Sequence, residues 1–161
     1  MVPIIMFVGK HNSGKTTLLT QIINRLENQG IRTGVIKGAR QNLDLPSNKD
    51  GEKLFNAGAS VVLTSGLDIQ IAYWRNKVSL DELIEAMDPD LDLIIIEGFK
   101  EAPYPKIEII RQDISEELLD ISNVIARVTD FNLNNDDDTK TFKFEEIEQI
   151  LDFIIHRIKL N

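Results

Sequence analysis

Residues 9–16 of the chain read GKHNSGKT, which matches the pattern G-x-x-x-x-G-K-[ST]. Glycines at this spacing let successive backbone N–H groups point inward and hold the oxygens of a phosphate chain. Lys15 is expected to reach the β- and γ-phosphates, and the hydroxyl of Thr16 is expected to ligate Mg²⁺. The motif, which we call the phosphate loop, therefore predicts a site for a nucleoside triphosphate.

The residues on either side of the phosphate loop agree with this interpretation. The continuous apolar run over residues 3–8 is typical of a buried strand. After Thr16, Leu and Ile recur at helical spacing until Gly30. A helix that begins at the loop adds the positive end of its dipole to a phosphate site. The alternative, a chance glycine turn ending in Lys-Thr, does not require this flanking strand and helix.

An acidic residue, Glu97, follows a second apolar run over residues 91–96. Ligands of parallel sheets bind at the carboxyl ends of the strands, so Glu97 is expected near the phosphate loop. There it would bind Mg²⁺ directly or through water, or position an attacking water. The alternative is a carboxylate in a salt bridge, for example with Lys100.

Three further residues are candidates for nucleotide contacts. Lys10 occupies the position from which some dimeric phosphate-loop proteins reach the partner's nucleotide, but the favoured alternative is a solvated lysine on the loop. Lys37 ends the second predicted strand. Asp130 follows the apolar run 124–128 and could accept hydrogen bonds from N1–H and the amine of guanine, but the N-K-x-D signature is absent. A loop or capping aspartate is the alternative.

Other charged residues could reach the same edge of the sheet, but each alone is better explained as solvated charge. They are Asp44, Asp50, Lys106, Glu108 and Arg111. Alternation places Lys106 and Glu108 on one face of a strand. If an arginine finger exists, the candidates are Arg40 and Arg111.

Apolar runs alternate with helical patterns along the whole chain, which predicts an α/β fold. We expect a mostly parallel sheet with helices on both faces, in one domain over residues 1–161. A turn at residues 66–68 predicts a small β-hairpin insertion. The expected strands are 3–8, 32–37, 60–65, 69–74, 91–96, 107–110 and 124–128. Helices are expected to begin after Thr16, at residue 53 and at residue 80, and a last helix at the C-terminus carries Ile147 to Ile158. Loops are expected over 38–50 and 132–140. Ser79 and Glu82 form a capping box for the helix over 80–87.

Composition excludes several classes of function. The 161 residues include no Cys, which excludes a disulfide scaffold, a thiolate zinc site and a cysteine nucleophile, and fits the cytoplasm. The net charge of −8 disfavours nucleic acid and anionic membranes as partners. No apolar run approaches the length of a membrane-spanning helix. His11 and His156 are isolated and predict no metal site.

Several segments together resemble the MobB family, the GTP-binding accessory proteins of molybdopterin-guanine dinucleotide biosynthesis. In collinear order they are GKHNSGKTT (9–17), VIK (35–37), Asp44 and Pro46 with Lys49-Asp50, AGA (57–59), DLIIIEGFK (92–100), PKIEIIR (105–111), and Ala126 with Thr129-Asp130. The phosphate loop alone is common to many families, and the two segments Glu-Gly-Phe-Lys and Pro-Lys-Ile-Glu are what distinguish this one. Residues 38–42 (GARQN) depart from it, because the family has a histidine-rich stretch there.

The resemblance implies a P-loop NTPase fold, a GTP·Mg²⁺ site, weak GTP hydrolysis and a homodimer. It also implies cooperation with the nucleotidyltransferase that joins GMP to molybdopterin, and it leaves open whether molybdopterin itself contacts the chain. Together with the motifs, it assigns nucleotide contacts to Gly9, Lys10, Asn12, Ser13, Gly14, Lys15, Thr16, Thr17, Lys37 and Asp130. Thr16 and Glu97 are the expected metal ligands, and Lys15 and Glu97 the expected catalytic groups.

Three hypotheses of function remain at this point. The first is a GTP-binding accessory protein with slow hydrolysis, since no catalytic base or arginine finger is evident, and such a finger is worth about 10³–10⁵ in rate. The second is a small-molecule kinase using ATP, which needs an arginine-rich lid that the sequence does not show. The third is a non-enzymatic adaptor whose bound nucleotide fixes a dimer or docks a partner.

Overall fold

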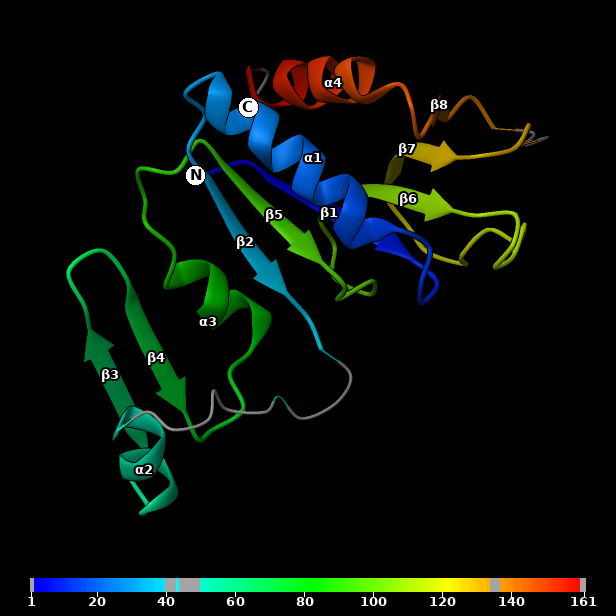
Figure 1. Cartoon of the computed structure of the whole chain (residues 1–161). Helices are drawn as coiled ribbons and strands as arrows, with labels where there is room; N and C mark the ends of the chain where they lie inside the picture. The colour runs from blue at the N-terminus through cyan, green and yellow to red at the C-terminus, as the bar shows by residue number, and fades with distance from the viewer. Residues whose placement is uncertain (1, 40–42, 44–49, 134–136, 160–161) are drawn as a thin grey trace. The chain divides into compact units, whose positions relative to one another are not determined.

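The computed structural model describes residues 2–39, 43, 50–133 and 137–159. The chain divides into two compact units, one of residues 1–38 and 84–161 and the other of residues 39–83 (Figure 1). The expectation of a single domain stays a prediction. Most of the predicted loop over 38–50, with Arg40 and Asp44, lies outside the described residues.

The larger unit is built on a six-stranded sheet in which every neighbouring pair of strands is parallel. Its order is β2-β5-β1-β6-β7-β8, with bounds β1 Ile4–Gly9, β2 Thr33–Lys37, β5 Leu93–Glu97, β6 Lys106–Ile110, β7 Val124–Thr129 and β8 Lys140–Lys143. The predicted α/β fold with a mostly parallel sheet is confirmed. Because all strands run the same way, their carboxyl ends share one edge, and β1 lies near the centre.

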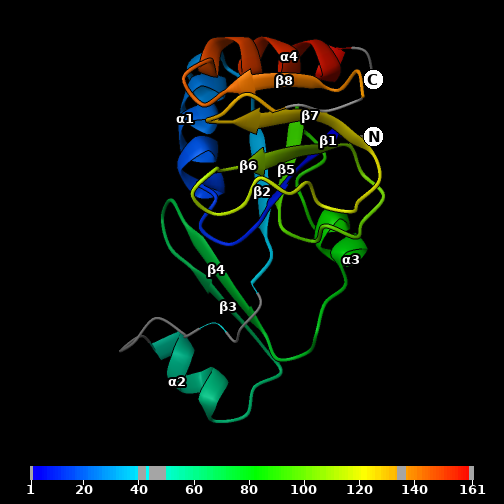
Figure 2. The same ribbon diagram turned by 90° about the vertical axis from the view of Figure 1, so that its right-hand side faces the viewer.

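Helices α1 (Lys15–Asn28) and α4 (Ile147–Lys159) pack against each other and against the same face of this sheet (Figure 1). Each helix repeats apolar residues at a spacing of three or four, so one stripe faces the sheet. The core therefore joins α1 residues such as Ile22 and α4 residues such as Ile150 to Phe7 and Ile95 of the strands. In Figure 2, β6, β7 and β8 lie side by side, with α4 beyond β8. Among the helices of the described ranges, none is long and apolar enough to cross a membrane.

The opposite face is covered partly by residues that follow the short helix α3 (Leu80–Glu85). A Cβ added to Gly34 of β2 would lie 2.6 Å from Leu91 Cδ1 and 3.2 Å from Met87 Sδ. Helix α3 carries the predicted capping box, since Ser79 N donates to Glu82 Oε2 (2.8 Å) and Glu82 N donates to Ser79 Oγ (3.2 Å). The helix ends two residues before the predicted Met87.

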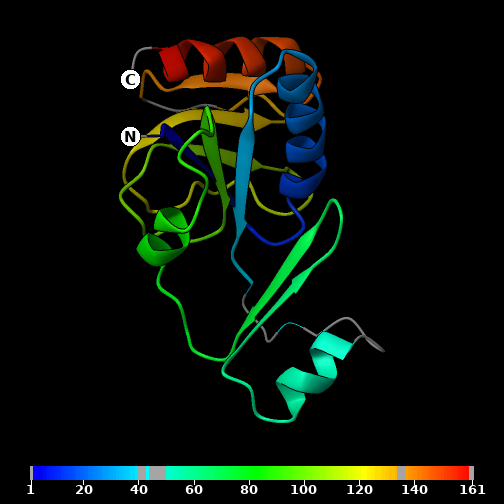
Figure 3. The same ribbon diagram turned by 90° about the vertical axis from the view of Figure 1, so that its left-hand side faces the viewer.

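The smaller unit contains helix α2 (Asp50–Asn56) and the antiparallel hairpin of β3 (Val61–Ser65) and β4 (Gln70–Trp74), which confirms the hairpin insertion (Figure 3). Helix α2 packs on one face of the hairpin, where the rings of Phe55 and Tyr73 lie 5.9 Å apart. On the other face, Leu63 and Trp74 are exposed.

The sequence pattern does not predict strand β8. It predicts a loop over residues 132–140, and β8 begins at Lys140. The strand has four residues, KTFK, and only Phe142 is buried. A strand with a single buried apolar residue shows no alternation of apolar and polar residues, so periodicity does not reveal it. Residues 134–136 of the expected loop lie outside the described ranges.

Candidate functional site

The phosphate loop connects β1 to α1 in a tight path that two glycines make possible. A Cβ on Gly9 would lie 2.4 Å from the carbonyl oxygen of Ile109 on β6, so a larger residue would push the loop off the sheet. Gly14 has φ 86°, a left-handed conformation that favours glycine, and Asn12 has φ 60°. Ser13 is buried, and its N–H donates to Lys10 O (3.3 Å) to close the turn.

Lys15, the first residue of α1, folds its side chain back over the loop. Its Nζ donates to the carbonyl oxygens of Lys10 (2.7 Å) and Gly9 (3.1 Å) and to Ser13 Oγ (3.4 Å). The loop thereby holds a cation at its centre, next to the N-terminus of a helix. Both features attract phosphate.

Thr16 and Glu97 meet across the neighbouring strands β1 and β5. The parallel register sets Glu97 beside Phe7, two residues before the loop begins. Thr16 Oγ1 lies 3.2 Å and 3.1 Å from the two carboxylate oxygens of Glu97 and donates to them. The Glu97 side chain is only 11% exposed. The sequence-based expectation that Glu97 lies near the loop is therefore met in the fold.

Lys37 joins these two residues from β2, where the register sets it beside Glu97. Its Nζ donates to Glu97 Oε1 (2.7 Å) and to Thr16 Oγ1 (3.3 Å). A hydroxyl and a carboxylate are the hard oxygen ligands that Mg²⁺ prefers, and Mg²⁺ commonly takes few protein ligands alongside phosphate and water. The described residues contain no cluster of three or more His, Cys, Asp or Glu that could hold a metal by themselves. The residues present fit a metal that arrives with a triphosphate.

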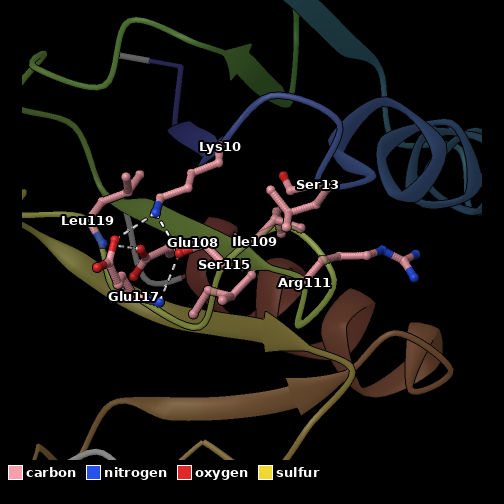
Figure 4. A pocket seen from close by; sticks show the side chains of 10 residues that line it. Lys10, Ser13, Glu108, Ile109, Arg111, Ser115, Glu117 and Leu119 are labelled. Carbon is pink, nitrogen blue, oxygen red and sulfur yellow. Dashed lines mark hydrogen bonds and ion pairs between the residues drawn. The ribbon is translucent and has the colours of Figure 1, made fainter.

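Lys10 points toward Ser115 and Glu117, in the segment that follows β6 (Figure 4). Its Nζ donates to Ser115 Oγ (2.5 Å) and pairs with Glu117 Oε2 (2.9 Å). The hydrogen bond from Lys10 lowers the pKa of Glu117 from its ordinary value. Within this one chain, Lys10 ties the phosphate loop to residues 115–117 and lines a small hollow with Ser13 and Glu108.

Asp130 and Arg111 lie at the carboxyl ends of β7 and β6. Asp130 Oδ1 accepts from the N–H of Gln112 (2.9 Å), and its Oδ2 lies 3.6 Å from Arg111 Nη1. Arg111 Cζ lies 4.1 Å above the ring centroid of Phe144, just after β8. The sequence did not single out Phe144, because its position depends on a strand that periodicity did not reveal.

Two predicted edge residues are neither at the edge nor solvated, which corrects the expectation for Lys106 and Glu108. Both are 1% exposed. They share a face of β6, as alternation predicted, but that face is covered by the chain segments on either side of the strand. Glu108 accepts from Leu119 N (2.6 Å) and from Arg127 Nε (3.3 Å).

Lys106 donates to three carbonyl oxygens, those of Ala102 (2.6 Å), Ser122 (3.0 Å) and Tyr104 (3.2 Å). Burial lowers its pKa, opposed by the charge of Glu101. Its position near the start of β6 makes it a support for the loops rather than a ligand group. Asp50 belongs to the smaller unit, at the start of α2, and pairs with Lys53 (2.9 Å).

The remaining predicted contact, Thr17, lies exposed in the first turn of α1. One edge of the sheet therefore brings together the loop, Lys15, Thr16, Glu97 and Lys37 on one side of β1, and Arg111, Asp130 and Phe144 on the other.

Comparison with known proteins identifies the family. The sequence model of the family described as "Molybdopterin guanine dinucleotide synthesis protein B" matches residues 4–130. The chain is 36% identical to the molybdopterin-guanine dinucleotide biosynthesis adapter protein of Haemophilus influenzae, over 95% of this chain and 88% of that protein. It is 32% identical to the adapter protein of that name from Escherichia coli, over 96% of this chain and 93% of that one.

Solved structures agree with this result. The crystal structure of Bacillus subtilis MobB is 28% identical and superimposes with a TM-score of 0.79, covering 96% of this chain and 97% of that one. A crystal structure described as molybdopterin-guanine biosynthesis protein B is 29% identical with a TM-score of 0.76, covering 97% of this chain and 99% of that one. The chain belongs to the MobB family of adapter proteins in molybdopterin-guanine dinucleotide biosynthesis.

Proposed function

We propose that this chain binds GTP with Mg²⁺ at the carboxyl edge of the main sheet and hydrolyses it slowly. In this role it serves, in the cytoplasm, the nucleotidyltransferase that joins GMP to molybdopterin. The observation that carries the proposal is the convergence of Lys15, Thr16 and Glu97 at the ends of two adjacent strands. A phosphate-binding loop, a cation and two oxygen ligands together are what a metal-bound triphosphate requires.

Each residue has a part that follows from its place. The backbone N–H groups of the loop and the ammonium of Lys15 bind the β- and γ-phosphates. Thr16 and Glu97 hold the metal, directly or through water. When bound, Mg²⁺ neutralises charge on the phosphate oxygens. Glu97, at the carboxyl end of β5, would also orient the water that attacks the terminal phosphorus.

Asp130 supports guanine as the base. A carboxylate offers two acceptor oxygens, which match the N1–H and the exocyclic amine of guanine and do not match adenine. The N–H of Gln112 (2.9 Å) and the guanidinium of Arg111 (3.6 Å) hold this carboxylate in place. These contacts leave each oxygen with further acceptor capacity.

Slow turnover is expected because the groups that could accelerate hydrolysis already contact one another or neighbouring side chains. Thr16 contacts both carboxylate oxygens of Glu97, and Lys37 contacts Oε1. Arg111, a candidate arginine finger, faces Phe144 and Asp130. An arginine finger is worth about 10³–10⁵ in rate, so a site without one hydrolyses GTP slowly.

A second candidate function is an adaptor whose nucleotide is not hydrolysed, and the H. influenzae and E. coli relatives, both described as adapter proteins, favour it. Phosphate release from GTP in the absence of any acceptor distinguishes the two. Measurable release supports the slow GTPase, and nucleotide-dependent association without release supports the adaptor.

We also propose that the chain acts as a homodimer. The open face of the β3–β4 hairpin supports this, because Leu63 is 74% exposed and Trp74 is 52% exposed. Neighbouring apolar residues of this size on an uncovered sheet face are typical of an interface. Both strands of the hairpin also keep an unpaired edge among the described residues.

Calorimetric titration tests the nucleotide assignment, with GTP and ATP each added with and without Mg²⁺. Tighter binding of GTP that depends on Mg²⁺ supports the roles of Thr16, Glu97 and Asp130 together. A preference for ATP would remove the guanine-reading role of Asp130 and favour the small-molecule kinase. Binding of neither nucleotide would overturn the proposed function.

A further inference from the structure

The guanidinium of Arg111 stacks over the ring of Phe144, and both side chains lie beside the phosphate loop. The guanidinium carbon lies 4.1 Å above the centre of the phenyl ring. A Cβ built on Gly14 would lie 3.3 Å from Arg111 Nε and Nη2 and 3.6 Å from Phe144 Cε1. The stack therefore sits directly against the last residue of the loop before α1.

The proposed function determines which way the bound nucleotide runs along the edge of the sheet. The inference about Arg111 rests on that proposed function. Mg²⁺ contacts the β- and γ-phosphates, and its ligands Thr16 and Glu97 lie on the β5 side of β1. The terminal phosphate must then lie on that side. The α-phosphate and the nucleoside extend the other way, toward the ends of β6, β7 and β8, which neighbour one another in the sheet.

The residues on that side hold the guanidinium of Arg111 between a ring and a carboxylate. Phe144 supports one face of the plane, and Asp130 Oδ2 lies 3.6 Å from Nη1 at its edge. Asp130 is in turn fixed by the N–H of Gln112 (2.9 Å). The Arg111 side chain is still 39% exposed, so the plane is held in place without being buried. Figure 4 shows it extending away from the cluster around Lys10.

We propose that Arg111, supported by Phe144, is the platform on which the base of the bound nucleotide stacks. Planar guanidinium groups stack on nucleobases, and such stacking tolerates any base because every base has a π-face. Arg111 thus contributes affinity for the nucleoside, whereas Asp130 reads the edge of the base. Phe144 acts as a positioning residue, because it holds the guanidinium beside Gly14.

The test compares GTP with inorganic tripolyphosphate, which has the phosphates but no base. Each ligand is titrated with Mg²⁺ into the wild type and into Arg111→Ala, Arg111→Lys and Phe144→Leu. Arg157→Ala is the matched control, because Arg157 lies 5.5 Å above the Phe153 ring on α4, in a stack remote from the loop. Thermal melting of each variant checks that it is folded.

We expect Arg111→Ala to weaken GTP binding roughly 5- to 150-fold, the range for loss of one stacked base, and to leave tripolyphosphate binding unchanged. Arg111→Lys keeps the charge and loses the plane, so GTP binding falls there too. Phe144→Leu lowers GTP affinity by a smaller factor, and Arg157→Ala changes neither ligand.

Four results would overturn the platform. Equal losses for GTP and tripolyphosphate would make Arg111 a phosphate ligand. Unchanged GTP binding in both Arg111 variants would make the stack structural. Equal affinity of the wild type for both ligands would show that the base adds nothing, while the proposed triphosphate site would survive. Failure of the wild type to bind either ligand would overturn the proposed function and the platform with it.

Discussion

The Nζ atom of Lys37 lies 2.7 Å from Oε1 of Glu97 and 3.3 Å from Oγ1 of Thr16. These two oxygens belong to the residues that we propose as metal ligands. The positively charged ammonium of Lys37 therefore contacts the hydroxyl of Thr16 and the carboxylate of Glu97. A divalent cation and this ammonium compete for the same carboxylate, because like charges repel at such distances.

Replacing Lys37 with Met removes the competing charge while keeping the length of the side chain. We expect Lys37→Met to bind Mn²⁺ about tenfold more tightly than the wild type in the absence of nucleotide, equivalent to about 1.4 kcal/mol. Electron paramagnetic resonance of free Mn²⁺ measures this. Lys53→Met, which breaks a lysine–carboxylate pair of the smaller unit, is the control. Unchanged Mn²⁺ affinity in Lys37→Met would contradict the competition.

Replacing Lys15 with Ala removes the cation at the centre of the phosphate loop. We expect Lys15→Ala to weaken GTP binding roughly 10- to 150-fold, the range for loss of a hydrogen bond to a charged group. The melting temperature should change little, because the hydrogen bonds described above join Lys15 to neighbouring residues of the same loop. Calorimetry and thermal melting measure the two effects. Unchanged GTP affinity would remove the phosphate-loop interpretation.

The change Glu97→Gln keeps the shape of the side chain and removes its negative charge. Thr16 can still donate to the amide oxygen, so the fold of the site should survive. We expect a larger loss in the rate of phosphate release than in affinity for GTP, because charge at this position acts on the metal and the attacking water. Single-turnover release and calorimetry give the comparison. Equal losses in both would assign Glu97 a purely structural role.

Lys106→Met tests the buried cation of β6. The change leaves three carbonyl oxygens without the ammonium that donates to them. A buried polar group without a hydrogen-bond partner lowers the free energy of unfolding by about 1–3 kcal/mol. We expect a loss of about 2–4 kcal/mol in the free energy of unfolding. Urea denaturation measures it, and a loss below about 0.5 kcal/mol, typical of surface changes, would contradict the supporting role.

The same lysine gives a dependence on pH. Burial lowers the pKa of Lys106 in the folded chain below its ordinary value of 10.5, so unfolding takes up a proton between the two pKa values. Raising the pH through that window therefore stabilises the folded wild type through this group. The difference in unfolding free energy between wild type and Lys106→Met should grow as the pH rises toward 10.5. A constant difference would show that the lysine is not desolvated.

The change Leu63→Lys tests the proposed dimer by placing a charge on the open face of the hairpin. Light scattering should give twice the chain mass of 18.3 kDa for the wild type and the single mass for the variant. Asn76→Lys, at an exposed polar position just after β4, adds the same charge and should leave the dimer intact. A monomeric wild type would refute the proposal, and so would a dimeric Leu63→Lys variant.

Sequence patterns predicted the elements that bury most of their residues. The strands β1 and β5 are runs of apolar residues, so both could be predicted, and their parallel pairing then brings Glu97 next to the loop. The loop motif itself requires particular residue types at fixed spacing. These parts of the site follow from local sequence and from the rule that parallel strands share an edge.

The parts that could not be predicted depend on what other segments cover. Lys106 and Glu108 alternate on β6 like solvated charges, and only the covering segments make them buried. Phe144 gains its role through β8, a strand with one buried residue. Neither the covering of a sheet face nor a four-residue edge strand leaves a periodic signal, because both arise from contacts distant in sequence.

The place of β1 between β5 and β6 has a consequence for how the chain folds during synthesis. Ile4 pairs in register with Ile94, and Met6 pairs with Lys106. During synthesis, β1 is therefore made about 90 residues before its neighbour β5 and about 100 residues before its neighbour β6. Such distant pairings slow folding, because the chain must close a long loop before the contacts form. Until then a wholly apolar strand is left without a partner on the ribosome, exposed to aggregation and to chaperones.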